Sequence, residues 1–372
     1  MTGPDLFDFQ LDGATVNARP GETILQAAQR QGVQIPRLCY SDGLRPDGNC
    51  RACVVEVKGE RTLAPSCCRA VQPGMVVDTD SERARKSQQM VLELLLADLP
   101  ERGHKWNDGP VAVGAPAPPP QSGQHGELSA WAARLGVKVR PALTALRRES
   151  PAPDLSHPAM AVNLDACIQC NRCQRACREA QGNDVIGLAF RGAHTQVVFD
   201  LADPMGASSC VACGECVQAC PTGALMPKSL SGSQKVDRSV DSVCPFCGIG
   251  CQITYKVRDE KIVAVDGRPG PANDGRLCVK GRFGFDYAHH PARLTRPLIR
   301  KAGVTKDPDH LHRDLHWSEV FREASWDEAL DLAAGRLVAL RDTHGKKALA
   351  GFGSAKGSNE EAYLFQKLVR TG

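Results

Sequence analysis

Seventeen cysteines, gathered into short runs, constrain the fold of this 372-residue chain more than any other feature. None lies between Cys68 and Cys167, and none follows Cys278. Because the count is odd, a framework of disulfides alone would leave one thiol unpaired. The N-terminus shows no secretory signal and no twin-arginine leader, which predicts a cytoplasmic location, where disulfides are rare. The pattern therefore favours metal ligation.

Two of the runs repeat one motif, from Cys167 and again from Cys210. They read Cys167-x2-Cys170-x2-Cys173-x3-Cys177 and Cys210-x2-Cys213-x2-Cys216-x3-Cys220-Pro221. Three cysteines at these spacings can surround one 4Fe–4S cluster, and the fourth ligand comes from the other half of the repeat. The spacing predicts one cluster on Cys167, Cys170, Cys173 and Cys220, and a second on Cys210, Cys213, Cys216 and Cys177. Arg178 replaces the second run's Pro221 without affecting a ligand.

Two further sets flank this repeat. The first contains Cys39, Cys50, Cys53 and one of the adjacent pair Cys67 and Cys68. Its long, uneven spacing favours an iron–sulfur cluster over zinc. The other is Cys244-x2-Cys247-x3-Cys251-x26-Cys278, a spacing that by itself suits zinc or a 4Fe–4S cluster.

The expected secondary structure places these sets in different modules. Residues 5–80 read as a small β-rich region with strands around 7–11, 54–57 and 75–77, a turn at Asp12-Gly13, and a helix over 23–31 closed by Gly32. Ser81 can cap a helix that runs to about Asp98, with Met90 and Leu94 on its apolar face. Residues 107–125 form a Pro/Gly-rich linker.

Later segments are predicted from the same patterns. We expect helices over 127–135, 326–340 and 359–369, and strands over 252–257, 261–265 and 348–352. The last strand and helix open an α/β domain, and one strand cannot complete a parallel sheet. We therefore expect the sequence to be the front part of a longer polypeptide, or to be completed by a partner.

The first and last cysteine sets resemble those of known families. A sheet crossed by one helix, with cysteines in the following loop, resembles a β-grasp plant-type ferredoxin. Ala64-Pro65-Ser66-Cys67 resembles the fourth-ligand segment of 2Fe–2S domains in complex I, NAD-linked hydrogenases and formate dehydrogenases, which selects Cys67 and leaves Cys68 free. Cys278-Val279-Lys280-Gly281-Arg282 resembles the cluster domain of molybdopterin oxidoreductases. That resemblance implies an electron relay through Lys280; the simpler interpretation is a solvated lysine.

The module order resembles the α subunit of soluble, NAD-dependent, molybdenum- or tungsten-containing formate dehydrogenase. The resemblance implies an α+β multidomain fold, with a β-grasp 2Fe–2S domain (1–80), a helical connector (81–160), a double 4Fe–4S ferredoxin domain (161–228), a molybdopterin oxidoreductase 4Fe–4S domain (240–300) and the beginning of an α/β pterin-binding domain (301–372). It implies one 2Fe–2S cluster, three 4Fe–4S clusters and a bis-molybdopterin guanine dinucleotide. Within the Gly/Ser segment 353–361, Gly353, Lys356 and Asn359 are the expected pterin contacts.

The implied reaction of the complete enzyme is formate + NAD⁺ → CO₂ + NADH. Electrons would leave the pterin-bound metal through the clusters and reach flavin- and NAD-binding diaphorase subunits that hold further clusters. The family's metal-ligating and catalytic residues would follow Gly372, so the chain alone is expected to carry electrons without oxidising formate. His289 and His290 are expected to be structural. His104, His125 and His157 lie in a stretch of sequence without cysteines and are expected to be ordinary surface side chains.

Other classes of function compete with this one. The chain could be an electron-transfer subunit of an NAD-linked hydrogenase, a molybdopterin oxidoreductase with another substrate, or a zinc-binding scaffold. A net charge of +4 and an aromatic content of 5% argue against nucleic-acid binding. The longest apolar stretch, around 92–99, contains Glu93 and Asp98 and is too short to span a membrane.

Overall fold

The computed structural model describes residues 6–99, 126–145, 147–148, 151–231, 236–306 and 315–372. The expected linker 107–125, His104 and His125 lie outside these residues. The chain forms two compact units. Unit 1 contains Met1–Ser242 and Cys251–Phe283, and unit 2 contains Val243–Gly250 and Gly284–Gly372.

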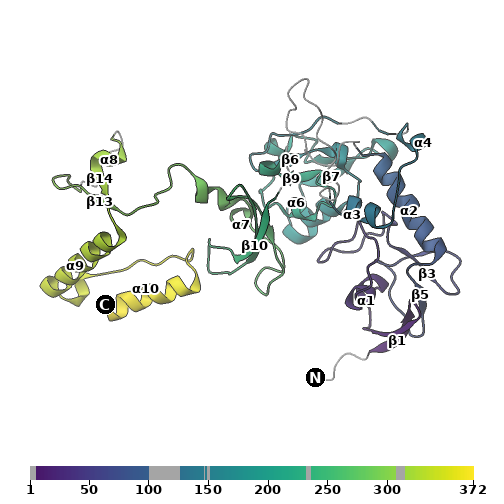
Figure 1. Ribbon diagram of the computed structural model, residues 1–372, viewed down its shortest axis with the longest axis horizontal. Coiled ribbons are helices and arrows are strands. Elements are labelled where there is room, and N and C mark those ends of the chain that lie inside the picture. Colours follow the sequence, from purple (N-terminus) through teal and green to yellow (C-terminus); the bar gives the residue numbers. More distant parts are fainter. Residues whose placement is uncertain (1–5, 100–125, 146, 149–150, 232–235, 307–314) are drawn as a thin grey trace. The chain divides into compact units, whose positions relative to one another are not determined.

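Unit 1 begins with a five-stranded sheet packed against one helix (Figure 1). The strands are β1 (Phe7–Leu11), β2 (Ala14–Ala18), β3 (Val54–Val57), β4 (Ala64–Pro65) and β5 (Val76–Asp78), in the order β2-β1-β5-β3-β4. β1 pairs antiparallel with β2 across the expected turn, where Asp12 and Gly13 both have positive φ, and parallel with β5.

Helix α1 (Ile24–Arg30) is fixed at both ends by its sequence. Thr23 and Gln26 form a capping box at its start, and Gly32 follows its end with a φ of +78°. Ile24 and Leu25 are buried in one core with Phe9, Val55 and Val77. This packing holds the loop after α1, which carries Cys39, Cys50 and Cys53, against the sheet.

Helix α2 (Glu82–Ala97) starts at Ser81, as predicted, but buries a different face. Leu92 and Ala84 are fully buried, whereas Met90 is 47% exposed and Leu94 is 56% exposed. Leu92 packs with Leu38 and Leu128. The prediction of the apolar face was wrong because α2 contacts both β3 and α3 (Glu127–Arg134), and these contacts select the side that is covered. A short helix, α4 (Pro141–Thr144), follows.

The repeated cysteine motif forms a compact module within unit 1. Two antiparallel ribbons frame it, β6 (Met160–Val162) with β9 (Leu225–Pro227), and β7 (Ile186–Ala189) with β8 (Gln196–Phe199). Helix α5 (Arg172–Arg175) continues as a π-helical turn, η2 (Ala176–Gln181), and contacts α6 (Glu215–Ala219). The 3₁₀ turns η1 (Leu164–Ala166), η3 (Gly192–His194), η4 (Met205–Ala207) and η5 (Lys228–Leu230) connect these elements.

The last part of unit 1 is a three-stranded sheet. Its strands are β10 (Arg238–Val243, whose last residue belongs to unit 2), β11 (Gln252–Arg258) and β12 (Lys261–Gly267), in sequence order. Helix α7 (Val279–Phe283) contacts β12. The two strands predicted over 252–257 and 261–265 are confirmed as β11 and β12.

Unit 2 contains η6 (Gly284–His289), the ribbon of β13 (Leu298–Arg300) and β14 (Phe321–Glu323), α8 (Trp317–Val320), α9 (Trp326–His344), η7 (Lys346–Ala348) and α10 (Asn359–Thr371). The predicted helices α9 and α10 are confirmed. The predicted strand over 348–352 is wrong: Ala348 ends η7, and no described strand pairs with the following residues. A strand needs a neighbour to satisfy its backbone groups, and this segment has none among the described residues.

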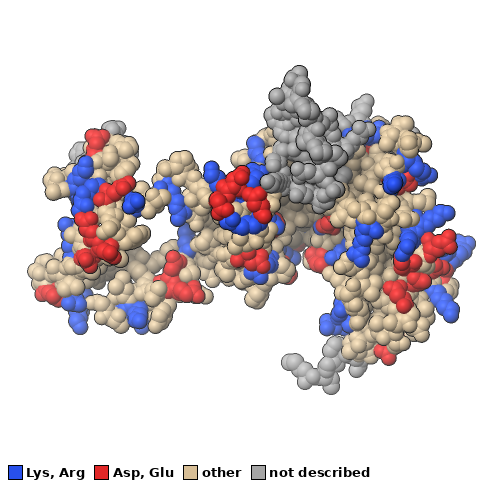
Figure 2. Space-filling model, viewed as in Figure 1, with Lys and Arg blue, Asp and Glu red and all other residues tan. Residues whose placement is uncertain are grey.

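On the face shown in Figure 2, Lys and Arg side chains are interspersed with Asp and Glu. Within the described ranges, no helix has the length and apolar character needed to cross a membrane.

Candidate metal centres

The first cysteine set comes together from the loop between α1 and β3 and the segment after β4. Cys39, Cys53 and Cys67 are at most 1% exposed, and the backbone N–H of Cys39 donates to Cys50 Sγ at 3.4 Å. Ser66 connects the segment after β4 to the end of the α1–β3 loop, because its backbone N–H and its hydroxyl both donate to the Cys53 carbonyl, at 3.1 and 2.7 Å. The folded loop therefore presents four thiols to one another.

The structure distinguishes the adjacent pair Cys67 and Cys68. The Cys67 thiol contacts those of Cys39 and Cys53, whereas Cys68 is exposed and its Sγ lies 3.5 Å from Cys67 Sγ. Cys68 is still close to the loop, because a Cβ on Gly48 would come within 2.9 Å of its sulfur. The geometry thus supports the expected choice of Cys67.

Thiol pKa values in this set show what charge the set can carry. Hydrogen bonds from Cys50 and Cys67 lower the pKa of Cys39 to about 2, and the contact with Cys67 lowers the pKa of Cys53 to about 7. The contact with Cys39 raises the pKa of both Cys50 and Cys67, and burial adds to it. The first thiolates form readily, but a full set of four requires a cation to balance them.

In the repeated motif, each half lends its last cysteine to the other half, as predicted. Cys220 would repel thiolates at Cys167, Cys170 and Cys173, and it lines with them a small cavity of about 20 Å³. Cys177 interacts in the same way with Cys210, Cys213 and Cys216. The structure thus brings together the two groups of four that the spacing predicts, and their role as cluster ligands stays a prediction.

The two halves also repeat in backbone geometry. Gln169 and Ala212 occupy equivalent positions, with φ of +54° and +56°, and each donates its N–H to the sulfur two residues earlier, at 3.4 Å. Val185 donates likewise to Cys177 Sγ at 3.4 Å. Left-handed backbone at a non-glycine residue is uncommon, and here it aims an amide at a sulfur.

These thiol sets fit iron–sulfur clusters. Burial raises the pKa of Cys167 to about 11 and raises the pKa of Cys170, Cys173 and Cys216 as well, so these groups strongly resist ionisation without a metal. Buried thiols that receive backbone N–H groups are the donor set of such clusters, and those hydrogen bonds tune the potential. In the described part of the chain, no group of three or more His, Cys, Asp or Glu side chains is arranged to hold a single metal ion.

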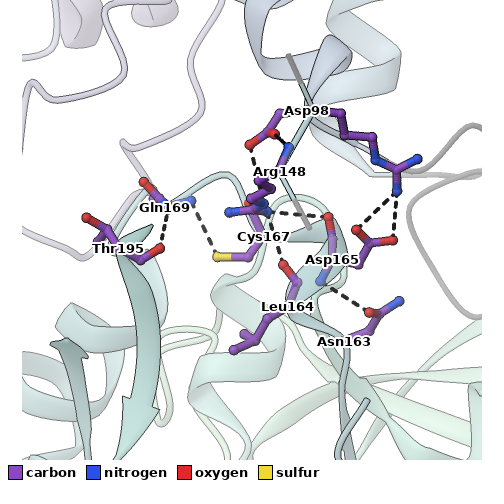
Figure 3. A network of polar contacts seen from close by, with 9 residues as sticks. Asp98, Arg148, Asn163, Leu164, Asp165, Cys167, Gln169 and Thr195 are labelled. Atoms are coloured by element: carbon purple, nitrogen blue, oxygen red, sulfur yellow. Dashed lines mark hydrogen bonds and ion pairs between the residues drawn. The ribbon is translucent and has the colours of Figure 1, made fainter. Parts of the chain in front are cut away.

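A network of polar contacts supports the loop that starts at Cys167 (Figure 3). Arg148 pairs with Asp98 at 3.3 Å and donates to the carbonyls of Leu164 and Cys167. On the other side, the Gln169 side chain donates to the Thr195 carbonyl at 2.6 Å. The loop that starts at Cys167 is thus connected to both the end of α2 and the β7–β8 ribbon.

The fourth cysteine set is divided between the units. Cys244 and Cys247 belong to unit 2, and Cys251 and Cys278 belong to unit 1, so this ligand set remains a prediction. Lys280 is exposed on α7. Two residues later, Arg282 is 2% exposed and pairs with Glu215 of α6 at 2.8 Å.

Within unit 2, the expected pterin loop lies beside the first half of that set. Gly248, next to Cys247, donates its N–H to the Ala355 carbonyl at 3.1 Å. A Cβ on Gly248 would lie 3.8 Å from Asn359 Oδ1, so Asn359 faces the same place. Gly353 and Lys356 are exposed in this loop, and Ser358 caps α10.

His157 differs from its expected role as a surface side chain. It is 5% exposed, and its Nδ1 accepts from the backbone N–H groups of Ala159 and Met160, both at 3.1 Å. The expectation was wrong because the ring closes the turn that leads into β6. His290 does have a structural contact, in which its Nδ1 accepts from the Ala292 N–H at 3.1 Å.

Sequence reasoning missed three arginines that donate to carbonyls of predicted ligand cysteines. They are Arg148 at Cys167, Arg175 at Cys39 and Cys170, and Arg282 at Cys213. Two of them carried a usable signal: Arg175 lies inside a cysteine run, one helical turn after Arg172, and Arg282 ends the Cys278–Arg282 motif. Arginine inside a metal-binding motif is a candidate for burial beside the metal, because such a charge requires a partner.

Four family models match successive parts of the chain. They are the 2Fe-2S iron-sulfur cluster binding domain at 5–82, the ferredoxin-like domain of NADH-quinone oxidoreductase subunit 3 at 157–226, the molybdopterin oxidoreductase Fe4S4 domain at 237–290 and the molybdopterin oxidoreductase domain at 293–372. These matches confirm the predicted fold class, including the start of a molybdopterin domain at the end of the sequence.

The chain spans about two fifths of the length of the curated relatives that it matches. The chain is 32% identical over 368 residues to the NADPH-Fe(3+) oxidoreductase subunit alpha of Geobacter sulfurreducens, covering 98% of this chain and 39% of that protein. It is 33% identical over 369 residues to an NADH-quinone oxidoreductase subunit of Rhizobium meliloti, covering 97% and 38%. A chain of an NAD⁺-reducing [NiFe]-hydrogenase matches 62% of this chain and 92% of its own length, at 26% identity and a TM-score of 0.51.

Proposed function

We propose that this chain carries electrons between a molybdopterin-bound metal and a flavin- and NAD-binding partner. It matches a 2Fe–2S domain, a ferredoxin-like domain and two domains of the molybdopterin oxidoreductase family. The observation that carries this proposal is the grouping of twelve cysteines into three thiol sets inside one compact unit. When bound, iron–sulfur clusters supply sites that accept and release single electrons.

The residues of the chain would divide the work as follows. Cys39, Cys50, Cys53 and Cys67 would hold a 2Fe–2S cluster, and the two crossed sets of the repeat would each hold a 4Fe–4S cluster. Cys244, Cys247, Cys251 and Cys278 would hold a third, with Lys280 as a relay toward the pterin. Backbone N–H groups of Gln169, Val185 and Ala212 would stabilise thiolate charge.

A direct backbone contact supports the assignment of the pterin end. The hydrogen bond from Gly248 to Ala355 places the Cys247 loop against the segment that contains Gly353, Lys356 and Asn359. A pterin held by this segment would therefore lie beside the Cys247 end of the fourth cysteine set. Bis-molybdopterin guanine dinucleotide is the form that we propose, held in part by backbone amides at the start of α10.

Formate is the substrate that we propose from the resemblance of the module order to formate dehydrogenase, with CO₂ and NADH as the products of the complete enzyme. The relatives described above are named as subunits or chains of an NADPH-Fe(3+) oxidoreductase, an NADH-quinone oxidoreductase and an NAD⁺-reducing hydrogenase. The substrate therefore needs a direct test. The decisive measurement is NAD⁺ reduction by formate in an assembled enzyme that contains this sequence. Hydrogen in place of formate as the effective donor would favour the hydrogenase-type alternative, which the structural relative supports.

A simpler test addresses the electron carrier itself. The anaerobically purified 372-residue chain is expected to be brown, to contain iron and acid-labile sulfide, and to bleach with dithionite. With formate and a redox dye it should show no turnover, because the chain spans under two fifths of its longer relatives. A colourless protein with bound zinc would contradict the proposal, and formate-dependent dye reduction would contradict the assignment of catalysis to the rest of the enzyme.

A further inference from the structure

The two halves of the cysteine repeat each meet a neighbouring module through a buried arginine, and this pattern has a functional meaning. In the first half, Arg172 and Arg175 extend from α5 toward the loop that holds the first cysteine set. In the second half, the equivalent positions are Glu215 and Gln218, and both receive Arg282 from the segment after Cys278. Equivalent helix positions, Arg172 and Arg175 in the first half and Glu215 and Gln218 in the second, therefore form the two junctions.

Arg175 occupies the first junction and bridges two thiol sets directly. Its Nη2 donates to the carbonyl of Cys39 and, at 3.3 Å, to the carbonyl of Cys170, and its Nη1 donates to the carbonyl of Arg45. The residue is 4% exposed. A single guanidinium thus contacts one ligand cysteine of each neighbouring set.

The charge of Arg175 has no acidic partner among the described residues. Its neighbour Arg172 pairs with Glu127 at 2.7 Å, but the hydrogen bonds of Arg175 all go to carbonyls, and its Nε is buried without a partner in the described chain. A buried charge is stable only when an opposite charge is near. The thiolate-ligated clusters on either side would supply that negative charge.

Arg282 occupies the second junction with a comparable set of contacts. Its Nε donates to the Cys213 carbonyl at 2.9 Å, and its guanidinium also binds Gln218 at 2.7 Å and Glu215 at 2.8 Å. Gly214 makes the approach possible, because a Cβ there would overlap Arg282 Cδ.

We infer that Arg175 and Arg282 are positioning residues of the electron path: each fixes a neighbouring module against the double-cluster module, and Arg175, whose charge has no acidic partner in the described chain, also raises the reduction potential of the clusters at its junction. The inference rests on the proposed function. A fixed positive charge stabilises the more negative, reduced state of a cluster, so it raises the potential. In each transfer one cluster loses one electron and its neighbour gains it, while the arginine keeps its charge and protons.

The test is a redox titration of the anaerobic holoprotein, with each cluster followed by electron paramagnetic resonance. Arg175→Gln is expected to shift the potentials of the 2Fe–2S cluster and of one 4Fe–4S cluster to more negative values. It should also weaken the magnetic interaction between these two clusters, because the guanidinium that binds both the Cys39 and the Cys170 carbonyl is lost. Arg175→Lys keeps the charge but lacks the planar guanidinium that binds several carbonyls at once. It should give a smaller shift of the potentials in the same direction.

Matched controls separate this role from general damage. Arg178→Gln changes an exposed arginine one turn away that pairs with Asp184, and it should leave all potentials unchanged. The double variant Glu215→Gln/Arg282→Gln removes the second junction without leaving a buried charge unpaired. Because the two removed charges offset each other, a change in a 4Fe–4S signal would come from the lost positioning contact to the Cys213 carbonyl, and the 2Fe–2S signal should stay in place.

The outcomes distinguish this inference from the proposed function. Unchanged potentials in Arg175→Gln with all clusters present, or an equal shift in Arg178→Gln, would overturn the inference alone. If Arg175→Gln does not retain its clusters, the absence of any shift in Arg175→Lys would overturn it. A wild-type chain without iron–sulfur signals would instead overturn the proposed function.

Discussion

At the residue scale, buried polar side chains carry much of the specific structure of unit 1. His157, Arg172, Arg175, Glu215 and Arg282 are all less than 9% exposed, and each of them bonds to backbone groups with its side chain as donor or acceptor. Glu215 accepts from the N–H of Leu277 at 3.1 Å. These contacts connect loops that the hydrophobic pattern alone would leave free.

His157 gives a pH-dependent prediction. Burial, and then the nearby charge of Lys228, lower its pKa, while Asp154 acts in the opposite direction. The native ring thus resists a proton that the unfolded chain accepts near pH 6.5. Stability should therefore be unaffected by this group above that pH and should decrease as pH falls below it.

The measurement is urea unfolding of the wild type and of His157→Asn at about pH 7.5 and about pH 5.5, on either side of the unfolded-state pKa. The Asn Oδ1 can accept from Ala159 and Met160 in place of Nδ1, but it does not titrate. The loss of unfolding free energy on acidification should be smaller in the variant. Equal losses in both proteins would show that His157 does not titrate in this range.

At the element scale, α2 shows how tertiary contacts select the buried side of a helix. Its N-terminus follows from Ser81, whose hydroxyl accepts from the Ala84 N–H at 3.2 Å and donates to Glu56 at 2.6 Å. Its periodicity permits more than one apolar face, since Met90, Leu92 and Leu94 all lie close together in the sequence. Packing against β3 and α3 covers Leu92 and leaves the other two in solvent.

Alanine substitutions at Leu92 and Leu94 should therefore differ sharply. Leu92→Ala leaves a cavity in the cluster with Leu38 and Leu128 and should cost about 3 kcal/mol of unfolding free energy. Leu94→Ala removes an exposed side chain of the same size and should cost less than about 0.5 kcal/mol. Thermal and urea unfolding measure both. Similar costs for the two variants would mean that α2 packs on its other face.

At the scale of the whole molecule, the two units differ in how much of their apolar surface is covered. Unit 1 contains three clusters of buried side chains. In unit 2, α9 and α10 have no buried residue, and Leu330, Tyr363, Leu364 and Leu368 are each at least 59% exposed. Helices gain most of their stability from packing an apolar face. We therefore expect α9 and α10 to be the less stable elements in a polypeptide of these 372 residues.

Limited trypsin digestion followed by mass spectrometry tests this expectation. Cleavage after Arg336 and Arg341 in α9 should precede cleavage after Arg172 and Arg175 in α5, which are buried. A longer polypeptide that includes the rest of the molybdopterin domain should protect α9 and α10. Cleavage of α5 at the rate of α9 would contradict the difference in stability.

The sequence by itself determined which residues we predict as ligands of the metal centres. Ligand spacing reflects the short reach of a turn of backbone, so Cys167, Cys170 and Cys173 could be grouped without a structure, and the repeat predicted the exchange of Cys177 and Cys220. The helix start at Ser81 was predicted for the same reason, because a cap acts over about three residues.

Only the tertiary structure decided which distant segments meet. The face of α2 that is buried, the burial of His157, the missing strand after η7 in the described chain and the two arginine junctions depend on neighbours far away in the sequence. Arg175 reaches Cys39 and Arg282 reaches Cys213 across separations of 136 and 69 residues, which no local pattern encodes. A buried guanidinium is stable only where packing supplies its carbonyls and opposing charge, so its role becomes visible only when the modules are folded together.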